Sequence, residues 1–468
     1  MDGASPSLDR HTDDPLRDRA LRSTLVALAA VLALDAADRT AVGALAPVLE
    51  REFHIGNTEI GLLASAFAIV GALATLPIGI LTDRVRRVAL IAVAVVIWAA
   101  ASGIAAAAAT FAVLFGARVL LGVVTAAGGP PVTSIIGDLV TPDQRGRALS
   151  WVKSGELIGA GAGFVVAGVL LSLSWRAVFA ALALLGVYVA WRVSRVPEPV
   201  RGGEGEPGDA PGEQELDAPG VLHDLVEQTE AEPPDEIVLQ GDQSETPLPE
   251  ALAYVMRVRT VVMVIAASVM AEFFFAALQV FGVLFLVEQF DLSASTAALL
   301  IPVVGIGGFV GVLLGGRLGD RLLERGVLTA RLHVGAWSYL VVSIAFLPVF
   351  LTSSLLVALP FLVCCGALLT APIAPLEAAR LDVVHPQLRG RAESVRLLAR
   401  VLAQAAAPLV FGVLSQNLGD GTNGVQLAFL ALLPGLAVSG VLLLLATKHY
   451  PAEVAAVEQS TVGSDEDV

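Results

Sequence analysis

The chain has 468 residues, of which 56% are hydrophobic and 16% are charged, and its mean hydropathy is +0.76. Soluble domains are about half apolar and about a quarter charged, so this composition excludes an ordinary soluble protein and indicates a bilayer as the solvent. The formal net charge of −15 comes mainly from residues 197–250 and the C-terminus, and it argues against a nucleic-acid partner, which would require clustered Lys and Arg.

Apolar runs of about 20 residues, the length that crosses a bilayer as a helix, recur along the chain. The first run follows a polar N-terminal segment and is too long for a signal-peptide core, so it predicts an uncleaved first helix. The twelve predicted spans are residues 23–48, 58–81, 88–108, 111–136, 147–171, 176–195, 259–287, 294–317, 331–351, 353–379, 392–415 and 425–447.

Basic residues precede the first span and follow every even-numbered span, whereas the opposite loops hold few. By the positive-inside rule both termini are predicted to be cytoplasmic, and we expect the plasma (inner) membrane. Residues 197–250 are rich in Pro, Gly and acids and predict a mostly disordered linker. The expected parts are an N-terminal tail (1–22), a first six-helix bundle (23–195), the linker (196–258), a second six-helix bundle (259–447) and an acidic tail (448–468).

Two blocks of sequence recur in the same order. Residues 79–84 (GILTDR) return as 316–321 (GRLGDR), at an offset of 237 (320 − 83). Residues 138–148 (DLVTPDQRGRA) return as 382–392 (DVVHPQLRGRA), at an offset of 244 (382 − 138). The blocks predict a duplication into two parallel halves, an arrangement in which a substrate site lies between halves that rock against each other.

The repeated loop, with Gly79, Leu81 and Asp83 followed by basic residues, resembles the major facilitator superfamily. The same resemblance extends to a helix 4 signature and a glycine-rich helix 5, carried by Arg118, Gly122, Ala126, Gly155, Gly159 and Gly163. It implies an all-α membrane protein in which twelve transmembrane helices form two pseudo-symmetric six-helix bundles (the major facilitator fold). It also implies alternating access, with a small-molecule or lipid substrate, protons and membrane lipids as partners.

Within that superfamily, the stretch Asp35-Ala36-Ala37-Asp38-Arg39, followed by Phe53 and Gly61, resembles the spinster family of lysolipid and sphingosine-phosphate transporters. Organic-anion symporters carry a similar Asp-Arg. Both families usually have a Glu on helix 4 at the position that Thr125 occupies here. The resemblance therefore implies an amphipathic anion as substrate, while Thr125 departs from the pattern in the substrate and proton pathway.

Three charged residues lie about halfway along the first predicted span, where an ionisable side chain is costly unless it faces a cavity or a partner. Asp35 and Arg39 share one helix face, and Asp38 flanks them. Two acids around one base leave a surplus negative charge. We predict that these residues line a cavity and that Asp38 or Asp35 takes a proton; the alternative is a static ion pair.

Further intramembrane polar residues extend this predicted pathway. Glu272 is the repeat partner of Asp35 (272 − 35 = 237), and we expect it to face the cavity, with Gln279 nearby, unless it makes only a structural hydrogen bond. Arg118 lies at the depth of Asp38 and is expected to contact either that acid or an anionic substrate.

A second group of charges, at the predicted cytoplasmic ends of the spans, is expected to form a gate. Asp and Arg in these loops can pair, or face helix ends, only when the inner halves approach. Setting topology is the alternative role for the arginines, and snorkelling is the alternative for the shallow helix residues. The predicted gate residues are Asp83, Arg84, Arg87, Asp138, Arg145, Glu156, Asp320, Arg321, Asp382, Arg389 and Arg400.

Several functional classes are excluded or disfavoured. Lys153 and Lys448 follow Val152 and Thr447, so the chain has no Walker Gly-Lys and is not an ATP-driven pump by itself. No His or Cys cluster accompanies the acids, so we expect no enzyme, no metal site and no cofactor.

We therefore predict a monomeric, proton-linked, alternating-access carrier for a lysolipid or sphingosine-phosphate-like anion. In this prediction Arg39 and Arg118 attract the anionic headgroup. An organic-anion/proton symporter, a multidrug-type exporter and a channel stay open as alternatives.

Overall fold

The computed structural model describes residues 19–140, 142–199, 229, 233–234, 236–239, 246–419 and 423–465. Every regular element in these ranges is a helix. Eleven of the described helices are long and apolar enough to cross a membrane, and they coincide with eleven predicted spans. The remaining span is α1 (Arg19–Phe53), a helix of 35 residues, which the charges Asp35, Asp38 and Arg39 set apart from the others by composition.

Seven helices and a short 3-10 turn build the N-terminal half. They are α1, α2 (Asn57–Arg84), α3 (Arg87–Ala106), α4 (Phe111–Thr125), η2 (Ala126–Gly128), α5 (Pro130–Leu139), α6 (Pro142–Leu170) and α7 (Trp175–Val193). The C-terminal half contains α9 (Leu248–Arg257), α10 (Arg259–Phe290), α11 (Ala294–Glu324), α12 (Ala330–Leu351), α13 (Leu355–Thr370), α14 (Ile373–Asp382), η3 (Pro386–Leu388), α15 (Arg389–Leu418), α16 (Gly424–Ala446) and α17 (Tyr450–Asp465).

Two predicted spans are broken helices. The fourth divides into α4 and α5 at η2, and the tenth divides into α13 and α14 at Ala371–Pro372. Pro130 and Pro372 lie at these breaks, because proline lacks the N–H of the helical ladder and its ring clashes with the preceding turn. Such a break is tolerated at membrane depth where it is buried in protein or lines a cavity. The break in the fourth span lies directly after Thr125.

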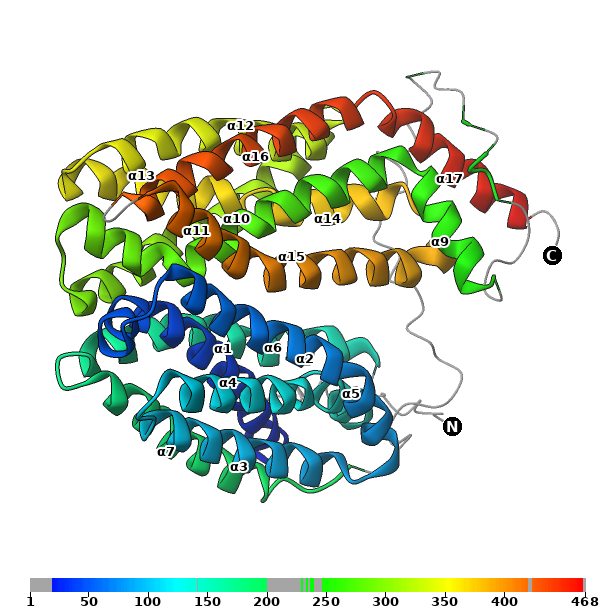
Figure 1. The fold of residues 1–468 in the computed structure, drawn as a ribbon. Coiled ribbons are helices and arrows are strands. Elements are labelled where there is room, and N and C mark those ends of the chain that lie inside the picture. The colour runs from blue at the N-terminus through cyan, green and yellow to red at the C-terminus, as the bar shows by residue number, and fades with distance from the viewer. Residues whose placement is uncertain are drawn as a thin grey trace, which may run out of the picture.

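The two halves lie one above the other in Figure 1 and diverge toward the end that carries α9 and α17. At the opposite end α2 packs against α15 with backbones in contact: a Cβ added at Gly61 would lie 2.2 Å from the carbonyl oxygen of Pro408. The Leu409 N–H also donates to Ser65 Oγ at 3.0 Å. We call this packed end the closed end, and the end with α9 and α17 the open end.

The closed end depends on glycine at several helix crossings. A Cβ at Gly43 would lie 2.3 Å from the Gln279 carbonyl oxygen of α10, and one at Gly412 would lie 2.3 Å from the Asn57 carbonyl oxygen of α2. Small residues of this kind let helix backbones approach closely in membrane proteins. Helices α1 and α2 of one half are thereby closely packed against α10 and α15 of the other.

Helical structure extends into the segments expected to be linker and tail. Helix α9 buries Ala251, Tyr254 and Val255, so it is an amphipathic helix rather than a disordered segment. Helix α17 begins within the predicted C-terminal tail, and its Glu453 carboxylate accepts hydrogen bonds from the N–H groups of Arg259 at 2.7 Å and of Thr260 at 3.0 Å. These bonds cap the start of α10.

Part of the linker also contacts the C-terminal half. Ile237 is buried, and the Leu239 N–H donates to Ser460 Oγ of α17 at 2.9 Å. The predicted disorder between residues 200 and 245 falls largely outside the described residues, as does most of the predicted 1–22 tail. Structure was missed here because the acid-rich composition of the segment masks two short apolar stretches, around α9 and around Ile237.

Candidate substrate and proton site

A fully buried ion pair connects α1 and α4. Arg118 donates to Asp38 with 2.6 Å between Nη1 and Oδ2, and the two side chains are 2% and 0% exposed. Asp38 Oδ1 and Arg118 Nε have no hydrogen-bond partner among the described residues. An under-satisfied buried pair of this kind is costly to keep and more costly to break.

A second pair lies beside it and faces the cavity. Arg39 contacts Asp35 at 2.7 Å, and its side chain is 47% exposed. Thr125 Oγ1 donates to the other oxygen of Asp35 at 2.8 Å, so the residue that stands in place of the family's Glu hydrogen-bonds an acid on α1. The ring of Phe67 on α2 lies under both guanidinium groups, 5.4 Å from Arg39 and 4.8 Å from Arg118.

The four charges of this site balance. Asp35 and Asp38 face Arg39 and Arg118, so the surplus negative charge expected from the sequence of α1 is wrong. The second base, Arg118, comes from α4. The sequence does not show which face of α4 points toward α1, so this contact could not be predicted. The geometry favours direct contact of Arg118 with Asp38 and leaves Arg39 as the accessible one of the two arginines.

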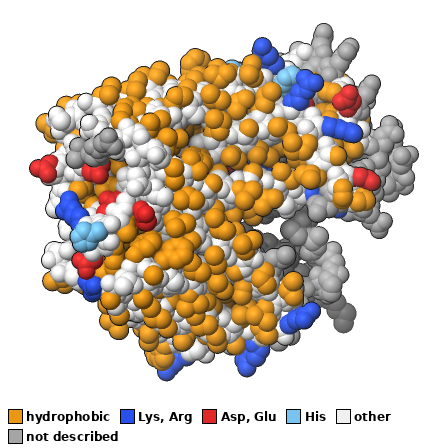
Figure 2. Space-filling view, viewed as in Figure 1, with side chains coloured by type: hydrophobic (Ala, Val, Ile, Leu, Met, Phe, Trp, Pro, Cys, Tyr) orange, Lys and Arg blue, Asp and Glu red, His pale blue; other side chains and the backbone are white. Residues whose placement is uncertain are grey.

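Asp35, Arg39, Phe67 and Thr125 line a cavity of about 300 Å³ between the halves. The buried Asp38 and Arg118 are not part of its wall, contrary to the expectation for Asp38. Helices α1, α2, α5 and α6 supply most of the wall, and α15 of the other half adds Val401 and Gln404. Lys153 and Glu156 also line it, so the predicted gate residue Glu156 lies at the cavity wall. Figure 2 shows the surface hollowed between the two halves at the open end.

Glu272 contacts α15 in the C-terminal half. It accepts a short hydrogen bond from Gln404 Nε2 and lies 3.4 Å from Arg400 Nε. Gln404 therefore contacts Glu272 and also lines the cavity that contains Asp35. Gln279 lies elsewhere: it is two turns further along α10, its carbonyl packs on Gly43 at the closed end, and the structure does not bring it to Glu272.

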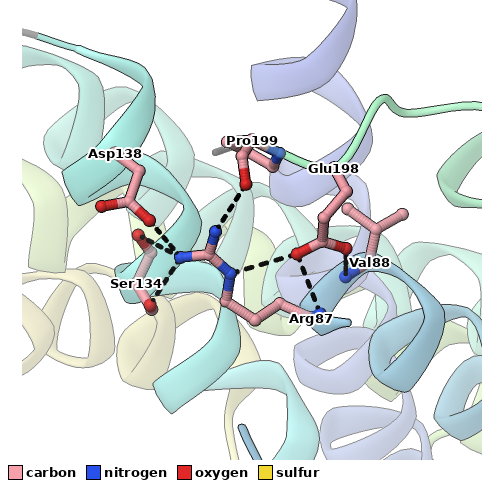
Figure 3. A network of polar contacts seen from close by, with 6 residues as sticks. All are labelled: Arg87, Val88, Ser134, Asp138, Glu198 and Pro199. Carbon is pink, nitrogen blue, oxygen red and sulfur yellow. Dashed lines mark hydrogen bonds and ion pairs between the residues drawn. The ribbon is translucent and has the colours of Figure 1, made fainter. Parts of the chain in front are cut away.

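At the open end, Arg87 forms the hub of a network in the N-terminal half (Figure 3). Its guanidinium binds Asp138 in a short ion pair, Ser134 Oγ at 2.9 Å and Glu198 at 3.2 Å. The Glu198 carboxylate also accepts from the backbone N–H groups of Arg87 at 3.0 Å and Val88 at 2.8 Å. This carboxylate thus caps α3, where an anion is favoured by the helix dipole.

The C-terminal half repeats this arrangement with Arg331 and Asp382, which lie 2.5 Å apart. Burial raises the pKa of the Tyr450 hydroxyl well above its ordinary value, so it stays protonated and donates to Asp382. Each pair lies within one half, so the expectation that pairing requires the inner halves to approach is wrong. Arg331 was missed, although the offset of 244 from Arg87 (331 − 87) identifies it.

The other predicted gate residues are dispersed. Arg84 and Arg321 are exposed, Asp320 lies 3.9 Å from Arg331, and Arg389 donates to the Leu381 carbonyl at 3.3 Å. The side chains of Asp83 and Arg145 lie outside the described residues.

The sequence interpretation also missed a cluster of four charges between α14 and α15. Arg380 lies 2.5 Å from both Glu377 and Glu393, and Arg396 lies 3.0 Å from Glu377 and pairs closely with Glu393. The signal is an acid followed by a base three residues later, present on both helices, which places opposite charges on one face.

Comparison with known proteins places the chain in a family. The model of the Major Facilitator Superfamily matches residues 28–379. The protein named spinster of Drosophila melanogaster is 26% identical over 181 residues, which cover 38% of this chain and 30% of that protein. The hexuronate transporter of Bacillus subtilis (strain 168) is 30% identical over 155 residues, 32% of this chain and 36% of that protein. The chain thus matches about a third of the length of these relatives.

Among solved structures, a bacterial homologue of the human lysosomal transporter Spinster, in an inward-facing and unoccupied conformation, is similar with a TM-score of 0.70. It is 22% identical, and the match covers 95% of this chain and 98% of that chain. The expected all-α membrane fold is confirmed, as is a transporter rather than an enzyme. The chain belongs to the major facilitator superfamily and is a multi-pass membrane transporter that resembles spinster.

Proposed function

We propose that this transporter is a proton-coupled carrier that moves an amphipathic anion, of the lysophospholipid or sphingosine-phosphate type, by alternating access. The observation that carries the proposal is the half-exposed Arg39, which faces a cavity between the halves and forms its ion pair with Asp35. The relative named hexuronate transporter supports an anionic substrate.

Arg39 is suited to an anionic headgroup. A guanidinium has five N–H donors in a planar fork that matches phosphate and carboxylate, and Asp35 uses only part of this capacity. The Phe67 ring restrains the guanidinium from below, so less side-chain entropy is lost on binding. Apolar side chains of the same cavity, among them Leu32, Val132 and Ile136, would accommodate a hydrocarbon chain.

Charge balance provides the coupling to protons. An anion that enters a neutral set of two acids and two bases leaves one uncompensated negative charge in a region of low dielectric constant. A proton on Asp35 restores neutrality and frees the fork of Arg39 for the headgroup. Asp35 is better placed than Asp38 for this role, because it is 22% exposed whereas Asp38 is fully buried.

Alternating access follows from packing at the closed end and separation at the open end. The Arg87–Asp138 and Arg331–Asp382 pairs each stabilise one half as a rigid unit, so the halves rock without internal rearrangement. Exposed Arg84 at the open end supports a cytoplasmic position for that end by the positive-inside rule. The arrangement requires only a monomer in the plasma membrane.

Binding to the purified full-length protein tests the substrate class. A lysophosphatidate and sphingosine phosphate are expected to raise the Tm more than a hexuronate at equal concentration, because they contact both Arg39 and the apolar side chains of the cavity. Arg39→Gln is expected to weaken lysophosphatidate binding at least tenfold, since a hydrogen bond to a charged group is worth about 1.5–3 kcal/mol. Arg84→Gln, an exposed arginine outside the cavity, is the matched control.

Stabilisation by the hexuronate or by small drugs, with no response to either lipid anion, would show that the amphipathic substrate class is wrong. It would instead favour an organic-anion symporter or a multidrug exporter, classes that the hexuronate relative and the Bacillus subtilis multidrug resistance protein 1 represent.

A further inference from the structure

The C-terminal half contains a pocket of about 150 Å³ that the proposed function does not use. Helices α10, α12, α13, α14 and α15 line it, and we call it the C-pocket. It is rich in charge: Arg380, Arg396 and Arg400 lie at its wall together with Glu272 and Glu377. Tyr339 and Thr370 supply hydroxyl groups.

Two of its arginines retain unused donors. Arg380 is 4% exposed and contacts Glu377 and Glu393, yet its Nε has no hydrogen-bond partner among the described residues. Arg400 is 46% exposed and contacts one acid, Glu272, at 3.4 Å. A buried N–H that lacks an acceptor is costly, so an anion oxygen that accepts from it in the C-pocket would relieve an existing cost.

The C-pocket is related to the Arg39 site by the internal repeat. Glu272 corresponds to Asp35, and each acid lies beside a half-exposed arginine. Gln404 connects the two sites, because it donates to Glu272 and lines the cavity that holds Arg39. The two exposed arginines therefore belong to opposite halves of the transporter.

We propose that the C-pocket is a second anion site, which binds a phosphate or carboxylate group through Arg400 and Arg380 while Glu272 takes a proton. The three arginines are balanced by Glu272, Glu377 and Glu393, so a bound anion requires one added positive charge. Glu272 is the group whose neutralisation frees Arg400. Tyr339, Arg396 and Arg400 line the C-pocket together with Glu272, Gln404 donates to Glu272, and α16, which also packs on α10, carries no charged residue.

The proposal rests on the proposed function only for the identity of the lipid anion. Equilibrium binding of a radiolabelled lysophosphatidate to the full-length protein in detergent tests the C-pocket separately from the Arg39 site. Wild-type protein is expected to bind two molecules, Arg400→Gln one, Arg39→Gln one, and the double variant none. Arg317→Gln, an exposed arginine on α11, is the control and should still bind two.

The number of lipid molecules bound distinguishes a failure of the C-pocket proposal from a failure of the proposed function. One bound molecule in wild-type protein, lost in Arg39→Gln and retained in Arg400→Gln, would overturn the C-pocket and leave the proposed function intact. One bound molecule that is lost in Arg400→Gln and retained in Arg39→Gln would overturn the Arg39 site and leave the C-pocket. Arg400→Lys, which keeps the positive charge, is expected to retain the second molecule with at least tenfold weaker affinity.

Two further measurements identify the ligand of the C-pocket and the residue that takes the proton. Inorganic phosphate that displaces one of the two lipids assigns the free anion as a ligand of the C-pocket, whereas displacement only by lysophosphatidate assigns the lipid headgroup. In the Arg39→Gln background, binding to the C-pocket should weaken as the pH rises, and Glu272→Gln should remove this dependence. A dependence that persists unchanged in Glu272→Gln would overturn the role of Glu272.

Discussion

Replacing Arg118 with glutamine is expected to lower the free energy of unfolding by about 3–5 kcal/mol, because it leaves the Asp38 carboxylate buried without its cation. The pair is almost inaccessible to solvent, and the side-chain atoms are 2.6 Å apart. Transport should be lost as well, since α4 would lose its ion pair with α1 and keep only the hydrogen bond from Thr125 to Asp35. Chemical or thermal denaturation in detergent, with transport assayed in parallel, measures both effects.

Two controls isolate the buried charge. Arg176→Gln removes the partner of Glu52, but both side chains of that pair are about half exposed, so its cost should be below about 1 kcal/mol. The double variant Asp38→Asn/Arg118→Gln removes both charges, and it should recover most of the stability lost in Arg118→Gln. If Arg118→Gln and Arg176→Gln had the same free energy of unfolding, the buried Arg118–Asp38 pair would not contribute to stability as expected.

Replacing Gly61 with valine is expected to prevent the closed end from closing and to reduce transport at least 100-fold. The added Cβ would meet the Pro408 carbonyl oxygen at 2.2 Å, and a backbone atom in a packed helix cannot move aside. The halves must then separate at this end. A loss of several kcal/mol for one state is enough to shift a two-state equilibrium almost completely.

Spin labels at Leu173 and Leu356, two highly exposed residues on opposite halves near the closed end, report this separation. The labels require a background in which Cys364 and Cys365 are replaced. Distances between them should increase in Gly61→Val. Gly79→Val is the matched control on the same helix, because a Cβ at Gly79 meets nothing within 4 Å. Unchanged distances in Gly61→Val would refute the role of this crossing.

Patterns that repeat along the chain were predictable. The lengths of the hydrophobic runs predicted the spans. The two sequence blocks predicted the two halves and showed that Asp35 and Glu272 occupy corresponding positions in them. Arg87 and Asp138 were predicted as gate residues, because both belong to repeated or motif-bearing loops, but their ion pair within one half was not predicted. Arg331 follows from the same repeat, since it lies 244 residues after Arg87.

Contacts that depend on helix rotation were not predictable. Gln404 carries no distinguishing sequence pattern, and packing between helices alone brings it to Glu272. Packing likewise brings Arg380 to Glu393, although the spacing of Glu377 and Arg380 is visible in the sequence. The charge of the α1 site was misjudged for the same reason, since Arg118 could face either Asp38 or a substrate. The breaks at Pro130 and Pro372 were signalled by proline but were obscured by the continuous hydrophobicity of the two spans.

The central claim is that Arg39 carries an amphipathic anion across the membrane while Asp35 carries a proton. Flux of a fluorescent lysophosphatidate in proteoliposomes, measured with and without a pH gradient, tests it directly. Flux through wild-type protein should saturate and should be accelerated by the gradient. Asp35→Asn should retain exchange that no longer responds to the gradient, and Arg39→Gln should abolish flux. A wild-type flux that ignores the gradient, or a gradient response that persists in Asp35→Asn, would contradict the account.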